Sequence, residues 1–150
     1  MITDTLAAGQ DTTRRARRTV MLVNGLFLTA IGAAQVSFEL LGYYLGAGPF
    51  GAVFHDSPYI IGWFENHGLA LLIGILFLAV AVRDGRRFWH GFALAVHVLL
   101  GAANLMFWSS FVTFDVVPMG IWATVAHALF VVAHVVCLVS SRRPQQAVSS

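Results

Sequence analysis

Lysine is absent from this chain, cysteine occurs once, and charged residues of either sign are scarce. Of its 150 residues, 11% are charged and 58% are hydrophobic, a balance that excludes an ordinary soluble domain. The single cysteine, Cys137, excludes an internal disulfide bond. The sequence also contains no glycine-rich phosphate loop, no nucleophile elbow and no H-E-x-x-H zinc motif, so none of these diagnostic patterns assigns a chemistry.

All nine positive charges are arginines, and they fall into three short clusters. Residues 14–18 carry the first cluster, residues 83–87 the second and residues 142–143 the third, with long apolar stretches between and beside them. Cytoplasmic loops of membrane proteins concentrate arginine and lysine, so this pattern predicts four spans with both termini in the cytoplasm. The net charge of +2 then reflects contact with anionic lipid head groups, and no nucleic-acid partner is expected.

The apolar stretches predict an all-α integral membrane protein, a four-helix bundle with up-down-up-down topology. The expected helices cover residues 18–45, 59–82, 88–109 and 118–140. Spans of about 20 residues leave no room for a second domain, and short connections favour antiparallel packing of sequence neighbours. We therefore expect a disordered cytoplasmic segment over residues 1–17, the transmembrane domain over residues 18–143 and a cytoplasmic tail over residues 144–150.

The first apolar stretch has a second interpretation as an export signal. Arginines followed by an apolar run and the small residues of 30–34 resemble a signal peptide or a twin-arginine signal. The apolar run continues to about Leu45, however, which is too long for a signal core. It also carries polar residues that match those on the other spans, so we expect an uncleaved first helix.

Ionisable residues inside membrane spans indicate function by default, because they are expensive to bury. His90, His97 and Asn104 are spaced by seven residues and share one face of the third helix, and His127 and His134 have the same spacing on the fourth. Residues of antiparallel helices lie at equal depth when their numbers have a constant sum. This relation pairs His90 with His134 and His97 with His127.

The first two helices add further polar residues. Asn24, Gln35 and Glu39 fall on one face of the first helix, whereas Glu65 and His67, two residues apart, point to opposite sides of a regular second helix. The expected outer layer contains Glu39, Asn104 and either Glu65 or His67; the middle layer His97, His127 and Gln35; the inner layer His90, His134 and Asn24.

Three interpretations of these layers remain open. The residues form hydrogen bonds that hold the bundle together, or a redox cofactor site, or a proton relay. Paired histidines from two membrane helices hold b-type haem, but helices 8–10 Å apart leave little room for it. A quinone, or a metal ion held by His67, His97 and His127 with Glu39 or Glu65, fits the spacing better.

Weaker signals concern catalysis and transport. A carboxylate beside a histidine supports acid–base catalysis on a lipid. No internal repeat is evident between the two halves of the chain, which lowers the case for a transporter. In the outer loop, His55 and Asp56 are expected either to bind a cation or to cap the start of the second helix.

The chain from Arg18 to Arg143 resembles small bacterial four-helix membrane proteins related to DoxX. The resemblance lies in the length, the arginine-flanked first helix and the run from Gly68 to Gly74 before a basic turn. It implies a bacterial plasma-membrane location, and that group includes a membrane subunit of a thiosulfate:quinone oxidoreductase. The high arginine content and the absence of lysine separately suggest a bacterial genome rich in GC.

Our leading hypothesis is a redox-associated accessory subunit that binds a quinone, a metal ion or a single b-type haem. His97 and His127 would be its central pair, with an outer entrance formed by Glu39, Glu65 and His67. The first alternative is a structural subunit that binds a membrane-protein partner or a second copy of itself, without a cofactor. The second is a lipid-modifying acid–base enzyme.

Overall fold

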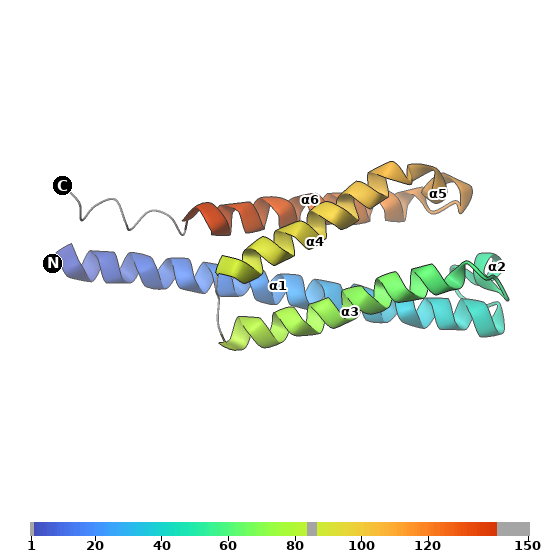
Figure 1. The fold of residues 1–150 in the computed structure, drawn as a ribbon, viewed down its shortest axis with the longest axis horizontal. Helices are drawn as coiled ribbons and strands as arrows, with labels where there is room; N and C mark the ends of the chain where they lie inside the picture. Colours follow the sequence, from blue (N-terminus) through green and yellow to red (C-terminus); the bar gives the residue numbers. More distant parts are fainter. Residues whose placement is uncertain (1, 84–86, 141–150) are drawn as a thin grey trace. The chain divides into compact units, whose positions relative to one another are not determined.

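The computed structural model describes residues 2–83 and 87–140, and all regular secondary structure in these ranges is helical. The helices are α1 (Ile2–Leu45), α2 (Gly51–Phe54), α3 (Ile60–Arg83), α4 (Arg87–Met106), α5 (Trp108–Thr113) and α6 (Val117–Ser140) (Figure 1). The expected all-α class is therefore confirmed. The expected tail over residues 144–150 lies outside the described residues.

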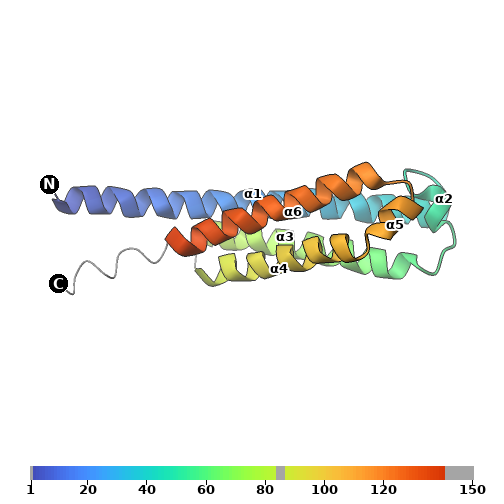
Figure 2. The ribbon, with the colours of Figure 1, turned by 90° about the horizontal axis from the view of Figure 1, so that it is seen from above.

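The chain divides into two compact units. The first contains α1 up to Met21 together with α4, α5 and α6, and the second contains residues 22–82, which hold the rest of α1, α2 and α3. In the first unit α4 and α6 form a helical hairpin with α5 at its turn (Figure 1 and Figure 2). In the second unit α1 and α3 form another hairpin, with α2 at its turn.

Four helices are long and apolar enough to cross a membrane. They are Asp11–Leu45, Ile60–Arg83, Arg87–Met106 and Val117–Ser140. Each exposes large apolar side chains, for example Leu26 (60%), Leu72 (63%), Leu99 (70%) and Leu129 (66%). Water would disfavour so much exposed apolar surface, whereas lipid accepts it and only requires that the backbone be hydrogen-bonded internally, as it is in a helix. The protein is a multi-pass membrane protein.

Helix α1 begins much earlier than the sequence predicts. Residues 2–17, expected to be disordered, continue the helix in the structure. Alanine and arginine in this segment favour helix, and Arg15 Nη2 donates a hydrogen bond of 2.9 Å to Asp11 Oδ2 one turn away. At 44 residues the helix is about 66 Å long, roughly twice the thickness of a hydrocarbon core.

The predicted third helix is interrupted near its C-terminal end. The helix expected over residues 88–109 ends at Met106 and is followed by the separate short helix α5. The chain reverses after α5 through Asp115, whose φ is 53°. Phe111 of α5 lies over Gly120 of α6, where an added Cβ atom would come within 2.6 Å of the ring. The missing side chain at Gly120 lets α5 pack onto α6.

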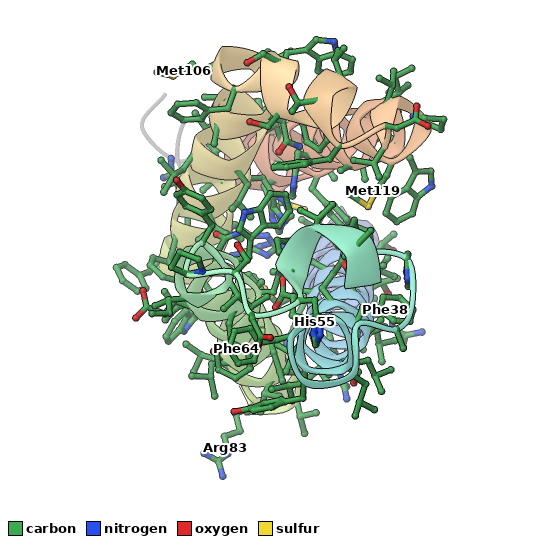
Figure 3. The ribbon with its side chains drawn as sticks, turned by 90° about the vertical axis from the view of Figure 1, so that its right-hand side faces the viewer. Phe38, His55, Phe64, Arg83, Met106 and Met119 are labelled. Carbon is green, nitrogen blue, oxygen red and sulfur yellow. The ribbon has the colours of Figure 1, made fainter. Side chains whose placement is uncertain are left out.

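The loop between α1 and α3 contains a four-residue helix that the sequence does not reveal. Helix α2 follows Gly46 and Gly48, whose φ angles of 58° and 80° are left-handed and suit glycine. His55 Nδ1 donates a hydrogen bond of 3.1 Å to the Tyr43 carbonyl, which ties the loop to the end of α1 (Figure 3). Just before α3 the Ser57 Oγ accepts a hydrogen bond from the Tyr59 amide at 3.4 Å. The expected roles of His55 and Asp56 stay predictions.

Candidate functional site

The hairpin of α1 and α3 is built on direct contact between helix backbones. A Cβ atom at Gly32 would lie 2.7 Å from the Leu71 amide nitrogen, and one at Gly74 would lie 2.5 Å from the Thr29 nitrogen. Any side chain at either position would force the helices apart, as is typical of small residues in membrane helix interfaces. These contacts fix the antiparallel register that brings Glu39 opposite His67.

Glu39 and His67 form the polar bridge of this hairpin. Glu39 Oε1 is hydrogen-bonded to His67 Nδ1, and the exposed fractions of the two side chains are 1% and 17%. The second carboxylate oxygen, Glu39 Oε2, is buried and has no hydrogen-bond partner among the residues that the structure describes. Glu65, the other candidate for the expected outer layer, is exposed. Because residues 65 and 67 point to opposite sides of α3, only His67 faces Glu39.

The hairpin of α4 and α6 carries both expected histidine pairs. His90 Nδ1 lies 2.9 Å from His134 Nδ1, and His97 Nδ1 lies 2.9 Å from His127 Nδ1. His90, His97 and His134 are fully buried. The equal-depth pairing predicted from residue spacing is therefore confirmed.

Ring stacking joins the two pairs into one series. The rings of His97 and His134 are nearly parallel, with centroids 6.1 Å apart and planes 17° apart. Phe130 stacks on His97 with a centroid distance of 4.7 Å and lies 6.4 Å from His134. We call the series His90, His134, His97 and His127 the histidine array. It runs along the α4–α6 interface and includes an aromatic neighbour, Phe130, that the pattern of polar residues did not single out.

The hydrogen bonds within each pair restrict its protonation. A bond between two Nδ1 atoms needs one nitrogen that carries a proton and one that offers a lone pair. At least one imidazole of each pair is therefore neutral, with its proton on Nε2. His90 Nε2 is buried and has no hydrogen-bond partner within the described ranges, so one end of the array has a ring nitrogen that is not hydrogen-bonded to any described residue.

The expected metal ligands do not form a metal-binding cluster among the described residues. The proposed ligands His67, His97 and His127 are divided between the two units, and among residues 2–83 and 87–140 no group of three or more His, Cys, Asp and Glu side chains is arranged to hold a metal ion. Two nitrogens that bind one zinc ion at about 2.0–2.1 Å in tetrahedral geometry lie about 3.3–3.4 Å apart. The observed 2.9 Å between paired Nδ1 atoms is shorter and is an ordinary hydrogen-bond distance.

The remaining predicted residues are also buried or half-buried. Asn24 is fully buried on α1, and Gln35 is half-buried. Asn104 is half-buried on α4, and its Nδ2 has no hydrogen-bond partner in the part of the chain that the structure describes. Asn104 belongs to the first unit and Glu39 to the second, so the expected outer layer remains a prediction.

Fold and site together define a class: an all-α, multi-pass membrane protein with a buried histidine array and a separate buried carboxylate–histidine bridge. Comparison with protein-family models, curated proteins and solved structures gave no match. Its function must therefore be argued from these two polar clusters.

Proposed function

We propose that the protein transfers protons along the histidine array. The observation that supports this proposal is the continuity of the array: two hydrogen-bonded imidazole pairs linked by the stacked rings of His97 and His134. Buried ionisable chains of this kind are typical of proton pathways in membranes. An array built only to hold helices together has no need for contact between its two pairs.

The chemistry of one pair gives the elementary step. When Nε2 of the donor ring accepts a proton, its Nδ1 proton passes to the Nδ1 of the partner, and the partner then releases its own Nε2 proton. Both rings end neutral, with their tautomers exchanged. Rotation of the rings restores the starting state. Transfer between His134 and His97 requires a ring movement or a water molecule, because their centroids are 6.1 Å apart.

The setting of this activity rests on the sequence. The arginine clusters support an up-down-up-down bundle with both termini in the cytoplasm of a bacterial plasma membrane. In that orientation His90 and His134 lie toward the cytoplasm, and His97 and His127 lie near the midplane. A redox-associated role, with a quinone as the partner that takes up or releases protons, agrees with the resemblance to the DoxX-related group. A single four-helix chain is small for this task, so we propose assembly with a second copy or a membrane-protein partner.

Proton flux into liposomes tests this proposal. Purified protein is reconstituted with an internal pH-sensitive dye, and flux is driven by a potassium gradient with valinomycin. We expect wild-type flux well above that of empty vesicles, and flux at the empty-vesicle rate for His127→Leu. His55→Leu is the matched control, because this ring lies in the outer loop with its side chain 55% exposed, and its flux should equal that of the wild type.

The structural interpretation is the second candidate, and the same pairs favour it. Both hydrogen bonds join α4 to α6, as polar side chains do when they stabilise membrane bundles. On this interpretation wild-type flux equals that of empty vesicles, and histidine substitutions change only the free energy of unfolding.

A further inference from the structure

Glu39 carries a hydrogen-bonding atom that the fold leaves unused. Its Oε1 is bonded to His67, but Oε2 is buried without a hydrogen-bond partner among the described residues. The side chain is only 1% exposed, so solvent does not satisfy this oxygen either. An unpaired buried acceptor costs free energy. A site that binds a hydrogen-bond donor would explain why such an atom is retained.

An aromatic cluster of Trp63, Phe54 and Phe50 lies next to the Glu39–His67 bridge. The Trp63 ring, one turn before His67 on α3, lies 6.0 Å from the His67 ring. Phe54 and Phe50 of the α2 region follow it, with ring centroids 5.4 Å and 6.4 Å from Trp63. These centroid distances are in the range of favourable aromatic contacts. A ligand bound beside the bridge would therefore contact the rings of this aromatic cluster.

Helix α2 covers the same face of α1 that carries Glu39. A Cβ atom at Gly42 would lie 3.5 Å from Phe54 Cβ and 3.4 Å from the Phe50 carbonyl oxygen, and Gly42 is one turn beyond Glu39. Figure 3 shows this end of the hairpin, with His55 holding the loop to α1. Because α2 is only four residues long and follows two left-handed glycines, a small shift of α2 is the simplest way to admit a ligand.

The charge of the bridge indicates what kind of ligand it would take. When Nε2 of His67 carries a proton, Glu39 and His67 share a second proton between Oε1 and Nδ1. The pair then has no net charge, whichever atom holds the shared proton. A charged ligand would remain uncompensated in this buried place. Oε2 offers lone pairs only, which calls for a neutral donor such as a hydroxyl group.

We propose that this site binds a neutral, lipid-soluble molecule with a phenolic hydroxyl group. The hydroxyl group donates a hydrogen bond to Glu39 Oε2, and the aromatic ring of the bound molecule packs against Trp63 and Phe54. This site lies wholly within the second unit, so the proposal does not depend on proton transfer by the histidine array.

Fluorescence of Trp63 tests the proposal with three matched probes. The other three tryptophans, Trp89, Trp108 and Trp122, are replaced by phenylalanine, and the protein is placed in lipid nanodiscs. 4-Nonylphenol is compared with 4-nonylanisole, which keeps the ring and tail but has no donor, and with 1-dodecanol, which has a donor but no ring. We expect the phenol to bind at least about tenfold more tightly than the anisole, the loss expected for a hydrogen bond to a charged acceptor. It should also bind more tightly than dodecanol, which keeps the donor but cannot make the ring contacts with Trp63 and Phe54.

Glu39→Gln provides the decisive variant, because it replaces the acceptor oxygen by an amide that can present a donor. We expect the preference for phenol over anisole to fall to about one, whereas Glu65→Gln, at an exposed position of α3, should leave it unchanged. Equal binding of phenol and anisole by the tryptophan-reduced protein, binding of dodecanol as tight as that of the phenol, or an unchanged preference in Glu39→Gln would each overturn the proposal. If Glu39→Gln fails to fold, the probe comparison with Glu39 in place still decides it.

Discussion

The two helical hairpins have the same architecture but are held together in different ways. In the α1–α3 hairpin the backbones touch at Gly32 and Gly74, and one carboxylate–histidine bridge joins Glu39 to His67. In the α4–α6 hairpin the comparable glycine, Gly101, has room for a side chain, since a Cβ atom there would lie in tight but tolerable contact, 3.4 Å from His127 Cβ. That interface instead buries a row of imidazoles.

This difference shows that close helix packing in this chain does not require buried polar side chains. Small residues let membrane helices approach closely and already provide stable association, while polar pairs add only about 0.6 kcal/mol on average. The α1–α3 hairpin shows that this chain can hold two helices together with glycine. The histidine array of the other hairpin is therefore more than the simplest way to join two helices, which is why we assign it a function.

The largest expected effect is the loss of His67. In His67→Leu, Glu39 is left buried without its partner, and breaking a buried pair in this way costs about 3–5 kcal/mol. The free energy of unfolding, measured by titration with sodium dodecyl sulfate in mixed micelles, should fall by this amount. The double variant Glu39→Leu/His67→Leu should recover most of it; a double variant as unstable as the single one would contradict the bridge.

The next effect concerns the glycine contact. Gly74→Ala places a methyl group 2.5 Å from the Thr29 nitrogen, and overpacking of this kind costs about 1–3 kcal/mol. Gly68→Ala, also on α3 but with nothing within 4 Å, is the control. It should gain up to about 1 kcal/mol from helix propensity. Equal stability of the two variants in the same titration would show that the backbones of α1 and α3 do not touch.

A smaller effect is expected for the histidine pair His90–His134. His134→Leu removes the partner of His90 Nδ1, and interhelical hydrogen bonds in membranes are worth about 0.6–1.7 kcal/mol. The free energy of unfolding should decrease within that range. A decrease as large as that of His67→Leu would mean that both hairpins depend on their polar contacts to the same degree.

The smallest effect is expected at Gly101. In Gly101→Ala the added methyl group meets His127 Cβ at 3.4 Å, a tight but tolerable contact, and alanine gains about 1 kcal/mol of helix propensity. We expect a net change within about 1 kcal/mol by the same titration. A loss comparable to that of Gly74→Ala would remove the contrast between the two interfaces.

The features that repeat along the sequence could be predicted from it. Long apolar runs predicted the four spans because length and composition suffice. The seven-residue spacing of His90 and His97, and of His127 and His134, predicted both pairs because antiparallel neighbours mirror each other about their turn.

Local and three-dimensional features could not be predicted in this way. The short helices α2 and α5 are too brief to have a hydrophobic period, and the helical extension over residues 2–17 depends on propensity and local pairs. The choice of His67 over Glu65 required the helix register set by Gly32 and Gly74. Contacts of Trp63 and Phe130 with the polar residues depend on side-chain packing that one sequence does not specify.

The most direct test of the central claim is the double variant His97→Leu/His127→Leu, studied for both stability and proton flux. Replacing both partners by apolar groups leaves no buried nitrogen of this pair unpaired, so the free energy of unfolding should stay within about 1 kcal/mol of the wild-type value. We predict that proton flux into liposomes nevertheless falls to that of empty vesicles. A stable double variant that retains wild-type flux would contradict a role of the histidine array in proton transfer.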